Sequence, residues 1–128
     1  LVPGKWALTV VAEQCDATCG DMLYRIRQVR TLLKGDSSRV TRLLLTRGTT
    51  APLPAAAKDS VQGLTQVSLD TTAASELAAA LAKAAGTNGL RLYLTDPLGN
   101  LVLHYPANFA NPGLQKDLKK LLGLSSIG

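Results

Sequence analysis

Apolar residues recur along the chain in two rhythms, and each rhythm predicts one kind of element. Short apolar or alternating runs predict five β-strands, at residues 6–12, 40–45, 64–69, 90–95 and 101–105. Apolar or alanine-rich stretches with helical spacing predict four helices, at residues 22–33, 54–62, 73–85 and 114–122. The predicted order is therefore β-α-β-α-β-α-β-β-α, with no internal repeat.

This order also predicts how the strands pair. The early β-α-β units favour parallel strands joined by right-handed crossovers. Pro97 and Gly99 lie between the last two strands and are typical of a tight turn, which predicts an antiparallel hairpin. We therefore expect one α/β domain spanning residues 1–128, with a central mixed sheet, flanking helices and a C-terminal helix.

Polar residues mark the expected ends of the helices. Asp16 or Thr18 is expected to cap the first helix, which stops near Gly35, and Asp21 is expected to complement the helix dipole in its first turn. The alanine-rich helix is expected to end at Gly86. Its candidate caps are Asp70, Thr71 and Thr72.

The chain is moderately basic, with a formal net charge of +5. Half of its cationic residues lie in one region: Arg25, Arg27, Arg30, Lys34, Arg39, Arg42 and Arg47. No aromatic residue interleaves with them, so nucleic-acid bases would find no surface on which to stack. We interpret these charges as a solvated helix face and strand ends, and expect no nucleic-acid partner.

No apolar stretch approaches the ~20 residues that cross a bilayer. The chain begins at Leu1 rather than at a methionine. We expect a trimmed soluble domain whose N-terminal signal or membrane anchor is absent from this chain.

The strongest chemical signal is a pair of cysteines, Cys15 and Cys19, the only two in the chain. They lie between the first predicted strand and the first predicted helix. The partial positive charge of a helix N-terminus stabilises a thiolate, and paired thiolates exchange disulfides or bind a soft metal ion. The alternatives are a static disulfide, which stabilises little across so short a loop, or two buried inert thiols.

Two further residues are candidate metal ligands. A continuous helix would place Cys15, Cys19 and Met22 on one face, and two thiolates with a thioether suit Cu(I). The alternative, which we favour, is that Met22 is the first core residue of the helix. His104, the only histidine, lies on the return strand of the hairpin, which we expect on the far side of the sheet from the cysteine loop; we therefore expect a structural role for it.

Two segments carry a resemblance to a known family. The first segment begins with Gly4-Lys5-Trp6 and continues through an apolar strand and Cys-x-x-x-Cys into a helix. The second, much later in the chain, is Leu92-Tyr-Leu-Thr-Asp-Pro-x-Gly99. This combination resembles the Sco family, which has a thioredoxin-like fold and assists cytochrome c oxidase assembly through copper handling and thiol redox chemistry. The resemblance covers nearly the whole chain. It implies a thioredoxin-like fold and a redox role for Cys15 and Cys19.

The chain departs from this family at two positions. Sco proteins have a proline directly after the second cysteine, where this chain has Gly20. The family's copper-binding histidine corresponds to Asn88, and a neutral amide oxygen is a poor ligand for copper. The resemblance therefore favours thiol redox chemistry over a complete copper site.

Three functional hypotheses remain open. The first is a Sco-like thiol–disulfide protein in which Cys15 attacks and Cys19 resolves. The second is a copper chaperone that binds Cu(I) through Cys15 and Cys19, with weak help from Met22. The third is a non-catalytic adaptor for oxidase assembly. The resemblance implies a cytochrome oxidase subunit or copper chaperone as partner, on the periplasmic side of the bacterial inner membrane.

Overall fold

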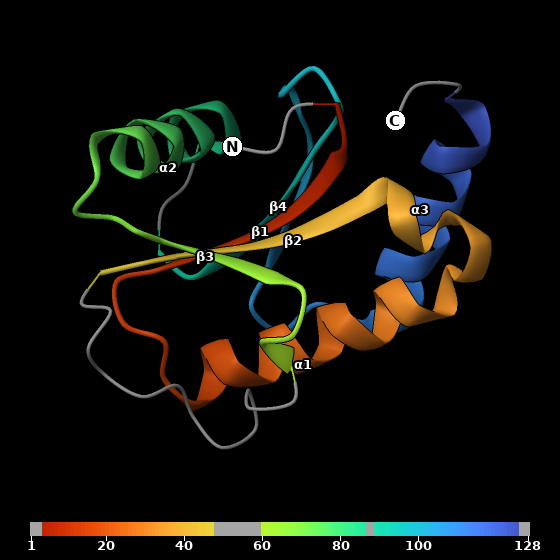
Figure 1. Ribbon diagram of the computed structural model, residues 1–128, viewed down its shortest axis with the longest axis horizontal. Helices are drawn as coiled ribbons and strands as arrows, with labels where there is room; N and C mark the ends of the chain where they lie inside the picture. Colours follow the sequence, from red (N-terminus) through yellow and green to blue (C-terminus); the bar gives the residue numbers. More distant parts are fainter. Residues whose placement is uncertain (1–3, 48–59, 87–88, 126–128) are drawn as a thin grey trace.

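A five-stranded mixed sheet with the order β3-β2-β1-β4-β5 forms the centre of the molecule (Figure 1). The structure is a computed structural model and describes residues 4–47, 60–86 and 89–125. The strands are β1 (Trp6–Ala12), β2 (Val40–Thr46), β3 (Leu64–Ser68), β4 (Arg91–Thr95) and β5 (Leu101–Pro106). β1 and β3 run parallel to β2, whereas β4 runs antiparallel to both β1 and β5. The predicted mixed sheet with a late hairpin is confirmed.

Helices cover both faces of this sheet. α1 (Ala17–Leu32) and α3 (Asn111–Leu124) pack on one face, and α2 (Thr72–Ala85) lies on the other (Figure 1). A 3₁₀ helix, η1 (Lys34–Arg39), connects α1 to β2. Among the helices of the described ranges, none has the length and apolar character that crossing a bilayer requires.

The helices differ from the sequence expectations in three respects. Most of the helix expected at 54–62 lies outside the described residues, and its described end at 60–62 is not α-helical. The last helix begins at Asn111 rather than at residue 114, with Pro112 in its first turn, where no intrahelical N–H bond is needed. The 3₁₀ turn of η1 was not predicted, because its sequence has no apolar periodicity.

The helix caps follow the sequence with one exception. Asp16 caps α1 by accepting a hydrogen bond from the backbone N–H of Cys19 at 3.0 Å. Thr71 caps α2, which ends at Gly86 with a φ of 69°. Asp21, however, lies beyond the first turn of α1, and its carboxylate pairs with Arg25 at 2.8 Å.

The two faces of the sheet carry cores of very different size. The face under α1 and α3 holds the larger core, which includes Leu8, Leu23, Ile26 and Leu118. The face under α2 holds a small cluster of three fully buried residues: Leu45, Leu69 and Ala74. α2 buries only Ala74 and Leu81 because most of its face is alanine.

Most of the clustered arginines do not form the solvated face that we expected. Arg42 is 3% exposed and donates to the carbonyl oxygens of Ser60 and Gln62 at 2.9 and 2.6 Å. Three other arginines also bind carbonyl oxygens outside their own elements: Arg25 (Ala107 and Phe109), Arg30 (Val40) and Arg39 (Leu122 and Ser125). The expectation was wrong because periodicity does not show that the connections bring unpaired carbonyl groups to these positions.

We predict that Arg42→Ala destabilises the protein by about 2–3 kcal/mol, because two carbonyl groups lose a charged donor, one of them in a buried bond. Urea denaturation measures this change. The matched control is Arg27→Ala, which removes the same charge from an exposed position and is expected to change the free energy of unfolding by less than about 0.5 kcal/mol. Equal effects of the two substitutions would contradict the assignment.

Candidate functional site

The two cysteines are joined in a disulfide at the carboxyl end of β1. Their Cα atoms are 5.0 Å apart, and the bond closes a loop of sequence separation four. Cys19 is wholly buried in the main core, whereas Cys15 is only partly buried against that core. Cys15 is thus the cysteine that a partner reaches more easily.

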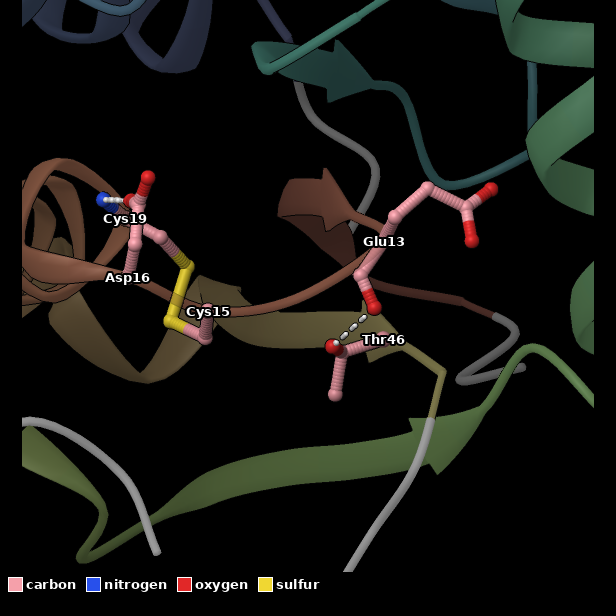
Figure 2. Close-up of a disulfide and its surroundings, with 5 residues drawn as sticks. All are labelled: Glu13, Cys15, Asp16, Cys19 and Thr46. Atoms are coloured by element: carbon pink, nitrogen blue, oxygen red, sulfur yellow. Dashed lines mark hydrogen bonds between the residues drawn. A yellow bond between two sulfur atoms is a disulfide. The ribbon is translucent and has the colours of Figure 1, made fainter. Parts of the chain in front are cut away.

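The start of α1 fixes the position of Cys19. Figure 2 shows the Asp16 carboxylate accepting the N–H of Cys19. The backbone N–H of Gly20 donates to the carbonyl oxygen of Asp16 at 2.8 Å, which closes the first turn of the helix. Cys19 therefore lies in the first turn of α1, at the end of the helix where the macrodipole is positive.

Hydrogen bonds from β2 fix the other arm of the loop. The carbonyl oxygen of Glu13 accepts from the hydroxyl of Thr46 at 3.3 Å (Figure 2). It also accepts from the backbone N–H of Arg47, at 3.1 Å. The Arg47 side chain binds the Glu13 carboxylate, and this hydrogen bond with its charge lowers the pKa of Glu13. Thr46 and Arg47 were not among the site residues that the sequence predicted. Their position at the carboxyl end of β2, the strand parallel to β1, could have indicated that they lie beside the cysteine loop.

A cavity of about 430 Å³ lies beside this loop. Its wall includes Gln14 and Asp16 from the loop and Tyr93 from β4. Ala78, Ala79 and Ala82 of α2 line another side, and their small side chains leave the space open. Gln14 and Asp16, which flank Cys15 in the sequence, line this cavity, whereas Cys15 and Cys19 do not.

Met22 does not share a continuous helix face with both cysteines. α1 begins at Ala17, so Cys15 precedes the helix, and the assumed spacing of the three sulfur atoms is wrong. Met22 is 0% exposed and belongs to the main core. This placement favours the alternative in which Met22 is a packing residue.

His104 lies away from the cysteines, although for a different reason than expected. β4 pairs directly with β1, so the hairpin is not on the far side of the sheet. His104 lies on β5, an edge strand that is two strands from β1. In the strand register it is level with Tyr93 and Thr9, about halfway along the strands and away from the end that bears the cysteines. Its Nδ1 atom is 2.9 Å from the guanidinium of Arg91.

The described residues do not complete a copper site of the Cys-Cys-His type. Within 4–47, 60–86 and 89–125, no three His, Cys, Asp or Glu side chains are grouped as metal ligands. Asn88, the residue at the family's histidine position, lies outside the described residues. In the described part of the chain, the candidate copper ligands are the sulfur atoms of Cys15 and Cys19. They become thiolates only after the disulfide is reduced.

Comparison with known proteins gives one family and several structural neighbours. The family model described as "Transmembrane-like, thioredoxin-like, C-terminal domain" matches residues 6–125. No curated protein sequence matches the chain.

Solved structures of similar fold include Sco proteins and a dsbF protein. Arabidopsis thaliana ScoI with copper bound has a TM-score of 0.68 and 16% identity, covering 97% of this chain and 88% of that one. BsSco, described as a Sco-family cytochrome c oxidase assembly protein with a disulfide switch, has a TM-score of 0.63 and 15% identity over 97% and 84% of the two chains. MTB dsbF in mixed oxidised and reduced forms has a TM-score of 0.57 and 17% identity over 94% and 83%.

These likenesses confirm the thioredoxin-like fold that the sequence predicted. The chain belongs to the family of transmembrane-like, thioredoxin-like C-terminal domains.

Proposed function

We propose that the protein is a Sco-like thiol–disulfide redox protein whose reacting groups are Cys15 and Cys19. The observation that carries this proposal is the disulfide itself, placed where the central strand β1 meets the N-terminus of α1. The fold neighbours support it, because a copper-binding Sco protein, a Sco protein with a disulfide switch and a dsbF protein share the fold.

The reaction follows from the different exposure of the two cysteines. The Cys15 thiolate attacks a partner disulfide, forms a mixed disulfide and releases one partner thiolate. The Cys19 thiolate then attacks the Cys15 sulfur and releases the second partner thiolate. The partner gains two electrons and the protein becomes the oxidised, disulfide-bonded form. Asp16 orients the first turn of α1, in which Cys19 lies.

By resemblance, the partner is a cysteine pair of a cytochrome oxidase subunit or of its copper chaperone. The resemblance also gives the place of action as the periplasmic side of a bacterial inner membrane, with an N-terminal anchor outside this chain. The cavity between the loop and the alanines of α2 offers space for the partner segment.

Cu(I) binding by the reduced cysteines is the second candidate function. It is favoured by the proximity of the two sulfur atoms, which meets the preference of Cu(I) for soft thiolate ligands. The third candidate function is that of a non-catalytic adaptor for oxidase assembly, which requires the fold but no reactive cysteine.

We predict that the two cysteines differ in reactivity when each is left alone. Cys15 in Cys19→Ser is expected to react with iodoacetamide at least about tenfold faster than Cys19 in Cys15→Ser, because the Cys19 side chain is buried. Alkylation rates followed by mass spectrometry measure this ratio. A faster reaction at Cys19 would reverse the proposed roles. If the thiols are unreactive in both variants and in the reduced native chain, the redox and copper hypotheses are excluded and only the adaptor hypothesis remains.

The redox potential of the native pair provides a second, independent prediction. We expect a reversible potential above about −300 mV, since structural disulfides typically have lower potentials. Equilibration with dithiothreitol and glutathione buffers measures it. A potential below that boundary would indicate a static disulfide and remove the support for the redox function.

The copper hypothesis is tested by anaerobic Cu(I) titration of the reduced protein. We expect Cys15→Ser to abolish any tight binding and Met22→Leu to leave the affinity unchanged, because Met22 packs in the core. Met22→Leu nearly preserves side-chain volume, so the fold tolerates it. A clear loss of affinity in Met22→Leu would make Met22 a ligand, and no tight binding by the native chain would exclude the chaperone function.

A further inference from the structure

Arg47 links the ends of three neighbouring strands at the edge of the sheet that bears the disulfide. Its Nε donates to the Glu13 carboxylate at 2.7 Å, and its second guanidinium nitrogen donates to the Asp70 carboxylate at 3.1 Å. Glu13 follows β1, Arg47 follows β2, and Asp70 follows β3. We call this group of three side chains the strand-end bridge.

The strand-end bridge acts on the arm of the loop that leads to Cys15. Glu13 is two residues before Cys15, and its carbonyl oxygen also accepts from the Arg47 backbone. Across Cys15 itself, the N–H of Asp16 donates to the carbonyl oxygen of Gln14 at 3.1 Å. Little freedom remains between the point that Arg47 holds and the Cys15 sulfur.

The other end of the strand-end bridge is itself held in place. The hydroxyl of Ser68 donates to the Asp70 carboxylate at 3.2 Å and accepts from the Asp70 backbone N–H at 3.1 Å. Asp70 directly precedes Thr71, the cap of α2. Arg47 is thus bonded to the junction between β3 and α2 while it holds Glu13.

Exposure argues against a role of these ion pairs in global stability. The side chains of Arg47, Glu13 and Asp70 are 49%, 74% and 64% exposed. Exposed ion pairs usually contribute little to the stability of a whole domain. A local contribution to the geometry of one short loop is therefore the effect to expect from them.

We propose that Arg47 is a positioning residue for the disulfide: by holding Glu13 it keeps Cys15 close to Cys19 and thereby sets their thiol–disulfide equilibrium. This inference rests on the proposed redox function. When the reduced pair is held together, closing the disulfide costs less chain entropy, and the oxidised form is favoured. Without the side-chain pair, Glu13 is held only through its carbonyl oxygen, by the Thr46 hydroxyl and the Arg47 N–H. Cys15 then moves more freely, and the disulfide is easier to reduce. Figure 2 shows the Glu13 carboxylate directed away from the sulfur atoms, which agrees with a positioning role rather than direct contact.

The test equilibrates each variant with glutathione buffers and measures the oxidised fraction by alkylation and mass spectrometry. Arg47→Ala is expected to shift the equilibrium toward the reduced form by about three- to tenfold, a tenfold change being roughly 30 mV. Arg27→Ala, which removes an exposed arginine from α1, is the control of equal charge and is expected to match the native chain. The urea midpoint of oxidised Arg47→Ala is expected to equal that of the control, which separates positioning from general destabilisation.

A double-mutant cycle tests the pathway through Glu13. Glu13→Ala alone and Glu13→Ala with Arg47→Ala are expected to shift the equilibrium as much as Arg47→Ala alone, since all three remove the same contact. Additive shifts, or a native equilibrium in Arg47→Ala, would overturn the positioning role and leave the redox function intact. If the native disulfide does not exchange with glutathione at all, both proposals fail.

Discussion

The geometry of the site depends on one constraint: β1 pairs with a strand on each side and leads into α1 through only four residues, 13–16. Because β2 and β4 both bond to β1, the strand cannot shift or twist independently. The Asp16 cap then fixes where the helix begins. The two cysteines sit on either side of that cap, and their separation follows from where the strand ends and the helix starts. Residues far from the sulfur atoms, such as the pairing partners in β2, therefore help to set that separation.

Guanidinium groups provide a second organising principle. Thioredoxin-like sheets have long connections, and each connection carries carbonyl groups that no regular element satisfies. In this chain Arg25 holds the connection from β5 to α3, and its guanidinium also lies 4.0 Å from the centre of the Phe109 ring. Arg42 does the same for the segment before β3. Arginine suits this work because one planar group satisfies two neighbouring acceptors at once. Much of the positive charge of the chain is therefore structural.

Sequence reasoning predicted the elements and the place of the reactive pair, because these depend on local patterns. Short apolar runs mark β1 and β2, and the capping preferences of Asp16 and Thr71 operate over a single turn. The errors concern features that are set by tertiary contacts. Met22 has the spacing of a ligand only if the helix includes Cys15. The capping bond from Asp16 makes the helix start at Ala17, after Cys15. Arg47 and Thr46 gained their roles from strand pairing across 33 or 34 residues, a distance over which local patterns carry no information.

The unequal cores on the two faces of the sheet imply unequal freedom around the disulfide. α1 is attached to a large apolar core, whereas α2 is rich in alanine and buries only Ala74 and Leu81. The core cluster on its face of the sheet holds three buried residues, one of which is Ala74 itself. Regions with few buried apolar contacts open at a lower free energy than the rest of a protein. We therefore expect α2 to open at a lower free energy than α1 and β1. The cavity between residues 13–16 and α2 consequently has one wall that belongs to the well-packed sheet and one wall, α2, that few buried contacts hold in place.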